Sequence, residues 1–166
     1  MAVHPGRYTA DIEGDFVVFL IGMRFNKAWK VHQWWPVFTA MPKMLRTIGQ
    51  HPELGCLGTQ AWFGRTTILL QYWRSFEDLD RFARDRELPH LEPWRRFNRA
   101  IAASGDVGIW HETYKVRAGE YEAIYGNMPE FGLAKAGRHL PARGKANSAA
   151  ARIGATTDDN PAVAPY

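Results

Sequence analysis

The sequence predicts an α+β protein with a ferredoxin-like βαββαβ domain over residues 16–117, assembled with a second copy as a dimeric α+β barrel. Three observations lead to this prediction. Apolar β-branched and aromatic runs alternate with segments of helical periodicity, in the order strand, helix, strand, strand, helix, strand. The strand segments carry large apolar side chains on both faces. No third helix is predicted inside the domain to cover the second face, so a second copy is expected to lie against it.

The first strand and the first helix are predicted from the opening third of the domain. Residues 16–25 (FVVFLIGMRF) form a β-branched and aromatic run of the length of a buried strand. The next segment has apolar residues at helical spacing, with Pro36 tolerable near its first turn and Pro42 expected to kink it. These apolar residues are Val31, Trp34, Trp35, Phe38, Met41, Leu45 and Ile48. Gly49 and Pro52 are expected to end the helix.

A hairpin and a second helix are predicted next. Residues 56–63 and 66–73 read as strands, and they flank Gly64-Arg65, a two-residue connection typical of a β-hairpin. Residues 75–78 (SFED) have the pattern of a capping box and therefore begin a helix, which continues as an amphipathic segment.

The last part of the domain is interrupted by prolines. Pro89 and Pro93 break the second helix around His90, and a further helical piece ends near Gly105. The alternating segment 107–116 (VGIWHETYKV) then predicts the final strand.

The regions outside the domain are predicted to be less structured. Residues 1–15 read as an N-terminal arm, and residues 118–137 as an extension that packs on its own or the partner subunit. After that, the composition becomes rich in Ala, Gly and Pro with almost no large apolar residues, so residues 138–166 are expected to form a mobile tail.

The net charge of +4 raises the question of nucleic-acid binding. Residues 134–166 hold five basic and two acidic residues, whereas residues 1–133 hold sixteen basic and fifteen acidic residues. Most of the charge therefore belongs to the C-terminal region. A neutral body without an aromatic RNA-binding motif cannot supply the phosphate contacts that dominate nucleic-acid affinity, so no nucleic-acid partner is expected.

Cysteine content and hydropathy indicate a cytoplasmic protein. Cys56 is the single cysteine, which excludes an intramolecular disulfide and a cysteine-based zinc site; it is expected to be a buried apolar residue. The N-terminal segment lacks the apolar run of a signal peptide, and no apolar stretch is long enough to span a membrane, so no membrane partner is expected. Glycine-rich phosphate-binding motifs, HExxH, CxxC and Gly-x-Ser-x-Gly are absent from the sequence.

Histidines are the candidates for proton transfer near neutral pH. His90 lies at a helix break, where its imidazole either projects between helix and sheet or binds an exposed helix end. His111 lies within the last strand, on the same face as Ile109 and Thr113, where it is either a dimer-interface or a pocket residue. His4 and His139 fall in the predicted terminal segments.

Arg24 and Asn26 share one face at the end of the first strand. Burying the Arg24 cation there costs several kcal/mol unless an acid such as Glu112 or an anionic ligand group pairs with it. The seven tryptophans all lie between residues 29 and 110, which indicates a bulky apolar interior.

Six strings of the sequence resemble a bacterial family of unknown function, DUF4188, also labelled monooxygenase af470-like. They are GMRFNK (22–27), AMPKMLR (40–46), QYWRSFEDLDRFARD (71–85), PHLEPWRRFN (89–98), GDVGIWHETYKV (105–116) and YEAIYGNMPEFGLAKAG (121–137). The resemblance covers about residues 16–137. It implies a dimeric α+β barrel related to the antibiotic biosynthesis monooxygenases, with a fungal member similar to oxygenases of polyketide-type substrates.

The resemblance also implies a pocket between sheet and helices. Small monooxygenases of this kind commonly oxidise aromatic or polyene substrates without metal or flavin, while several relatives bind haem through a histidine. The segment 72–94 resembles their Trp-acidic-helix-His stretch, so His90 is the position carried over, as a base or a haem ligand. Trp73 and Trp94 are expected to shape the pocket, with Tyr72 and Asn26 as further substrate-binding residues.

The leading hypothesis is a homodimeric monooxygenase acting on a small hydrophobic, aromatic or polyketide-like substrate. His90 acts as the base, Arg24 stabilises the substrate anion, and His111 is a further catalytic candidate. The cofactor is either none or haem, and in the second case His90 or His111 is the axial ligand. A non-catalytic small-molecule-binding or stress-associated protein is the remaining alternative.

Overall fold

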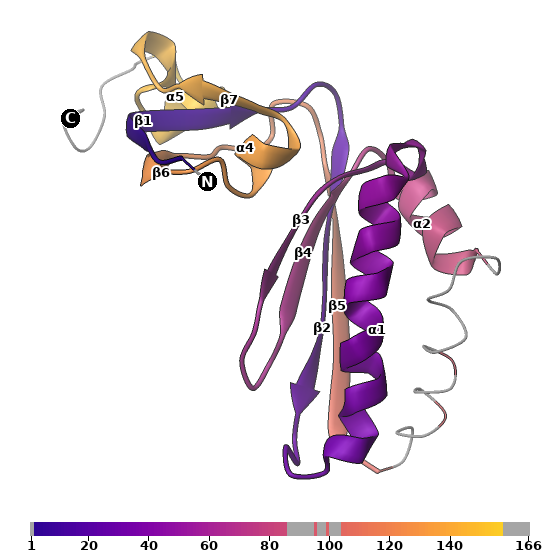
Figure 1. Ribbon diagram of the computed structural model, residues 1–166. Helices are drawn as coiled ribbons and strands as arrows, with labels where there is room; N and C mark the ends of the chain where they lie inside the picture. Colours follow the sequence, from indigo (N-terminus) through magenta and orange to yellow (C-terminus); the bar gives the residue numbers. More distant parts are fainter. Residues whose placement is uncertain (1, 86–94, 96–98, 100–103, 158–166) are drawn as a thin grey trace. The chain divides into compact units, whose positions relative to one another are not determined.

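The computed structural model describes residues 2–85, 95, 99 and 104–157, and the chain divides into two compact units (Figure 1). One unit is the continuous segment Val17–Tyr114. The other joins the two ends of the chain, Met1–Phe16 and Lys115–Tyr166. The predicted mixed α+β class is confirmed, with antiparallel strand pairs in both units.

The continuous unit contains a four-stranded sheet in the order β3-β4-β2-β5. In chain order its elements are β2 (Phe16–Phe25), α1 (Val31–Gln50), the 3₁₀ turn η1 (Pro52–Leu54), β3 (Cys56–Trp62), β4 (Ile68–Trp73), α2 (Phe76–Arg84) and β5 (Val107–Val116). β2 is a central strand, as expected from its apolar run. The further helical piece expected around residues 94–101 lies mostly outside the described residues.

One face of this sheet is covered by α1 and α2 (Figure 1). Val17 of β2 and Trp73 of β4 pack there with Ile48 of α1 and Leu79 and Phe82 of α2. Nearer the other end of β2, the same face buries a second cluster. It consists of Met23 and Val107, with Phe25, Trp34 and Ile109 packed against them. We call this the helix-covered face.

The start of α2 agrees with its sequence signal, whereas the hairpin does not. The hydroxyl of Ser75 accepts a hydrogen bond from the Asp78 amide at 3.1 Å, which confirms the predicted cap of α2. α1 continues through both Pro36 and Pro42. The hairpin connection is longer than expected, because residues 65–67 do not pair within the hairpin. They hydrogen-bond to the end of β2 instead, and the Thr67 amide donates to the Met23 carbonyl at 2.8 Å.

The opposite face of the sheet carries a second set of large side chains and is called the open face. Trp62 and Ile68 form a cross-strand pair there and are 40% and 36% exposed. Trp110 crosses Gly22 so closely that a Cβ added at Gly22 would lie 2.8 Å from the indole nitrogen. Within the described part of the unit, no helix packs on these residues in the way that α1 and α2 pack on the other face.

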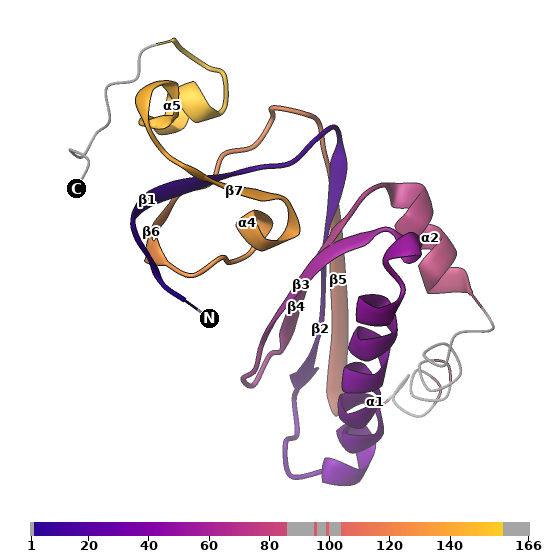
Figure 2. The ribbon, with the colours of Figure 1, turned by 45° about the horizontal axis from the view of Figure 1, so that its top comes forward.

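The second unit is built on a three-stranded sheet in the order β6-β1-β7 (Figure 2). Its elements are β1 (His4–Asp11), β6 (Tyr125–Met128), α4 (Leu133–Ala136), β7 (Arg138–Pro141), the 3₁₀ turn η2 (Gly144–Ala146) and α5 (Ala149–Arg152). The segment expected as an arm, residues 1–15, therefore supplies the central strand β1. The segment expected as a tail, 138–166, supplies β7, η2 and α5.

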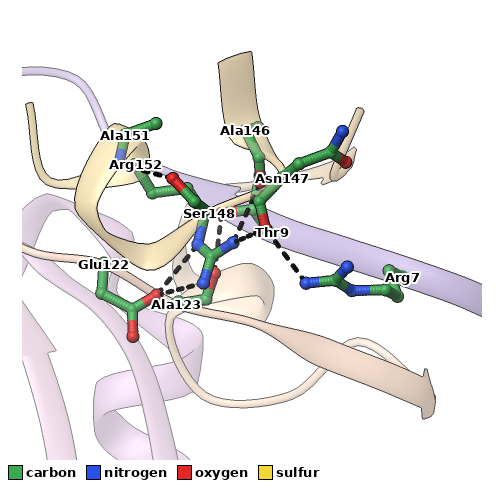
Figure 3. Close-up of polar contacts among 9 residues, drawn as sticks. All are labelled: Arg7, Thr9, Glu122, Ala123, Ala146, Asn147, Ser148, Ala151 and Arg152. Carbon is green, nitrogen blue, oxygen red and sulfur yellow. Dashed lines mark hydrogen bonds and ion pairs between the residues drawn. The ribbon is translucent and has the colours of Figure 1, made fainter. Parts of the chain in front are cut away.

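α5 is held by a buried arginine (Figure 3). The guanidinium of Arg152 pairs with Glu122 and also donates to the carbonyls of Ala146 and Asn147. Arg7 of β1 donates to the same Asn147 carbonyl at 3.1 Å. No helix in the described part of the chain is both long and apolar enough to span a bilayer.

Candidate functional site

Three side chains form a row across adjacent strands of the helix-covered face. Phe19 of β2 lies directly opposite Gln71 of β4 in the antiparallel register. On its other side, the Phe19 ring lies 6.0 Å from the His111 ring of β5. His111 belongs to this face because side chains alternate along a strand and Ile109, two residues earlier, packs against Met23.

Gln71 is the buried polar residue of this row. It is 1% exposed, and its Oε1 accepts a hydrogen bond from the Trp73 indole at 3.0 Å. Because the indole nitrogen is only a donor, this contact fixes the orientation of the amide and directs Nε2 elsewhere. Nε2 is buried and has no hydrogen-bond partner among the described residues. A buried donor without a partner costs about 1–3 kcal/mol, which an acceptor atom of a ligand would recover.

The row combines groups with different chemistry. Gln71 offers an amide donor in an apolar setting, Phe19 offers an aromatic surface, and His111 offers an exposed imidazole. Because Phe19 lies between Gln71 and His111, an aromatic ligand over Phe19 would lie between a buried amide donor and an exposed imidazole. Gln71 was not among the residues predicted from the sequence; a glutamine inside an otherwise apolar strand was the available signal.

Arg24 and Asn26 lie together near the end of β2. A Cβ added at Gly108 of β5 would lie 3.6 Å from the Arg24 Cβ and 3.7 Å from the Asn26 Nδ2. Arg24 is exposed and donates to the Thr66 hydroxyl at 2.8 Å, and Asn26 donates to the Gly105 carbonyl at 3.0 Å. Because Arg24 is exposed, the desolvation cost considered for a buried cation at this position does not arise.

The expected site residues are divided between the two faces of the sheet. Tyr72 alternates with Gln71 and Trp73 and so lies on the open face, as Arg24 does. His111 and Trp73 lie on the helix-covered face. Trp73 is fully buried behind Gln71 and positions its amide, rather than lining a pocket itself.

Two of the expected residues, His90 and Trp94, lie outside the described residues. Both belong to segment 86–94, so their roles remain predictions from the family resemblance.

An aromatic cluster at the start of α1 adds apolar surface near the end of β2. Phe25 contacts Trp34 at 4.8 Å between ring centroids, and Phe38 continues the chain of rings to Phe63 at 6.0 Å. Trp35 stacks on Phe38 and is half exposed, and Phe63 is 73% exposed. The tryptophan content predicts a bulky apolar interior for this region, whereas part of this cluster reaches the surface.

Cys56 is partly buried, less than the fully buried apolar residue that its strand predicts. It packs against the core beneath α1 and α2, and burial raises the pKa of its thiol to about 11. A thiol with so high a pKa is a poor nucleophile at neutral pH, so Cys56 is not a catalytic candidate.

The sequence pattern of the monooxygenase af470-like family matches residues 16–133. The chain belongs to this family. The predicted resemblance is therefore confirmed, and the matched region contains the Phe19–Gln71–His111 row as well as Arg24 and Asn26. It covers the whole of the continuous unit and reaches into the second unit.

Two known proteins that are similar to this chain, one in sequence and one in structure, are longer than it. Monooxygenase af470 of Aspergillus fumigatus is 31% identical, and the alignment covers 69% of this chain and 44% of the relative. An aldoxime dehydratase crystallised in complex with butyraldoxime is similar in structure, with a TM-score of 0.57, 18% identity and coverage of 74% of this chain and 37% of that chain. The second likeness supports the fold. The chain spans less than half the length of either protein.

Proposed function

We propose that this member of the monooxygenase af470-like family oxidises a small hydrophobic, aromatic or polyketide-like substrate bound on the helix-covered face. The observation that carries the proposal is the buried amide of Gln71, whose Nε2 has no partner among the described residues and which lies in a row with Phe19 and His111. Phe19 supplies an aromatic surface for the substrate ring.

The proposed chemistry begins with loss of a proton from a phenol or enol of the substrate. His90, carried over from the family resemblance, or His111 accepts that proton, and the Gln71 amide donates a hydrogen bond to the resulting oxyanion. The anion then transfers electrons to molecular oxygen. One oxygen atom enters the ring to give a quinone-type product and the other leaves as water, so the substrate supplies all the electrons.

Haem-assisted oxidation is the second form of the proposal. The exposed imidazole of His111, beside an aromatic ring on the helix-covered face, is the observation that favours it. In this form His111 or His90 would hold the haem iron, which would supply the oxygen chemistry.

A second copy of the chain is proposed to cover the open face. The large side chains there, Trp62, Ile68 and Tyr114 among them, are 36–51% exposed and follow three different strands. Pairing two such faces would remove this apolar surface from water and place Arg24 at the border of the interface.

Oxygen uptake with a panel of polyphenols tests the proposed activity. We expect uptake by the wild type and a loss of about 100-fold in kcat/KM in Gln71→Leu, the scale of one lost oxyanion donor. His32→Gln, an exposed histidine of α1, serves as the control and should retain full activity. Equal rates for wild type and Gln71→Leu would contradict the role given to this row.

Separate measurements identify the residue that accepts the proton and test whether haem is the cofactor. His90→Ala and His111→Ala are compared, and the variant with the larger loss of kcat identifies the proton acceptor. A Soret band after addition of haem, absent in His111→Ala or His90→Ala, would identify the axial ligand. Full activity in protein without a Soret band would exclude the haem form of the proposal.

A further inference from the structure

Three metal-ligating side chains meet in the second unit, which contributes nothing to the row described above. One ring nitrogen of His4, one ring nitrogen of His139 and a carboxylate oxygen of Glu130 all lie within 4.8 Å of one another. The histidines come from β1 and β7, and Glu130 comes from the segment between β6 and α4. No other such group of three or more is found among the described residues.

The backbone brings the two histidines together. His139 lies opposite Ala10 in the β1–β7 register, so its ring lies on the same face of the sheet as Tyr8. The His4 ring contacts the rings of both Tyr8 and His139. The register of β1 shifts between His4 and Arg7, where Gly6 adopts a positive φ of 96°. This irregularity bends the start of β1 and leaves the His4 and His139 ring centroids 4.8 Å apart.

Aromatic contacts hold the His139 ring in place. Tyr8 stacks on it at 4.3 Å with an interplanar angle of 20°, and Tyr125 contacts its edge at 6.1 Å. Such packing fixes the orientation of an imidazole, as the surroundings of metal-binding histidines do in known sites.

One nitrogen of His139 has no hydrogen-bond partner. Its Nε2 is buried and unpaired among the described residues, although imidazole nitrogens are strong donors or acceptors. Leaving such an atom desolvated and unpaired is unfavourable. Coordination of a cation by the neutral ring would remove this cost.

We propose that His4, Glu130 and His139 form a binding site for a divalent transition-metal ion. Two imidazole nitrogens and one carboxylate oxygen suit Zn²⁺, Co²⁺ and Fe²⁺, whereas Mg²⁺ and Ca²⁺ prefer all-oxygen sites. Metal–ligand bonds of about 2.0–2.2 Å require ligand atoms roughly 3.3 Å apart, so small side-chain rotations from the present separation complete the site. Glu130 is exposed and free to make that movement. Three protein ligands leave a coordination position for water or substrate.

Metal titration of the purified, untagged protein tests the site. Zn²⁺ binding is measured by calorimetry, and Co²⁺ binding is followed by its visible absorption, which reports the ligand geometry. We expect one saturable site in the wild type and an increase in Tm with Zn²⁺ by mass action. His139→Ala and His4→Ala should weaken binding about tenfold or more.

Two variants make the test independent of folding defects. Glu130→Gln replaces an exposed side chain, so it should fold as the wild type does, weaken binding and reduce the Tm increase. His51→Gln is the matched control, because His51 also contacts a glutamate, with 2.7 Å between its Nδ1 and the Glu53 Oε1, but belongs to no such triad. Its binding should equal that of the wild type. Absence of saturable Zn²⁺ binding, or binding unchanged in His139→Ala and Glu130→Gln, would overturn the proposal.

Discussion

Arg152 and Glu122, thirty residues apart in the sequence, are joined by two contacts of 2.8 and 2.9 Å to the same carboxylate oxygen. The Arg152 side chain is only 6% exposed, although it comes from a segment that the sequence assigns to a mobile tail. Its remaining donor group binds the carbonyls of Ala146 and Asn147, at 2.9 and 3.0 Å. One guanidinium therefore connects α5, η2 and the segment before β6.

Removing this guanidinium should release the end of the chain. Arg152→Ala removes the donor to the Ala146 carbonyl and leaves the Asn147 carbonyl with Arg7 alone. We expect faster amide hydrogen exchange across η2 and α5 and faster tryptic cleavage after Arg143. Arg152→Lys keeps the charge but cannot make the branched contacts, so it should lie between wild type and alanine variant. Identical exchange in all three proteins would show that Arg152 does not hold this segment.

Trp73 should affect catalysis through Gln71 alone. Trp73→Phe keeps an aromatic ring against Phe82 but removes the donor that orients the Gln71 amide. We expect a lower kcat with little change in KM, as for a positioning residue. In the double variant with Gln71→Leu, activity should equal that of Gln71→Leu, because the two residues act as one unit. A loss of activity in the double variant equal to the sum of the losses in the two single variants would contradict this coupling.

Asp106 should give the continuous unit a pH-dependent stability. Ion pairs with Lys27 at 2.7 Å and Lys30 at 2.6 Å lower the pKa of this carboxyl to about 2, from its ordinary value of 3.8. A carboxyl with a lowered pKa stabilises the folded state fully above its unfolded pKa. The contribution is lost as the pH falls through the folded pKa.

The comparison of wild type with Asp106→Asn isolates this contribution. The urea midpoint of the variant should be lower than that of the wild type at about pH 6. The two midpoints should approach each other as the pH falls to about 2, where protonation of the folded aspartate sets in. A difference of constant size across this range would assign the effect of the substitution to packing instead.

Cys56 should resist thiol reagents in the folded protein. Because burial raises the pKa of its thiol to about 11, the reactive thiolate is scarce near neutral pH. Alkylation of the native protein should be slow and should accelerate as the pH rises toward that value. The urea-unfolded protein, as control, should react like an ordinary thiol, and rapid labelling of the native protein would refute the burial of Cys56.

The sequence was sufficient where local pattern and tertiary structure agree. The apolar run of β2, the periodicity of α1 and the Ser75 cap each predicted an element that is present, because each signal lies within a few consecutive residues. The hairpin length was not predictable from Gly64-Arg65, since residues 65–67 hydrogen-bond to β2, about forty residues away in the chain.

The candidate sites depend on contacts that no local pattern encodes. Gln71 becomes notable only once Trp73 is known to occupy its Oε1 and leave Nε2 unpaired. His4 and His139 stand at opposite ends of the sequence, and only the β1–β7 pairing brings their rings together. By contrast, alternation along β5 correctly placed His111 on the face of Ile109.

The position of β1 between β6 and β7 has a consequence for biosynthesis. β1 leaves the ribosome before the continuous unit does, but both of its sheet partners lie beyond residue 124 and emerge after that unit. The continuous unit, in contrast, has all of its strands once β5 has emerged. During translation, β1 therefore has unpaired edges until β6 and β7 emerge, and in that interval it is exposed to incorrect pairing.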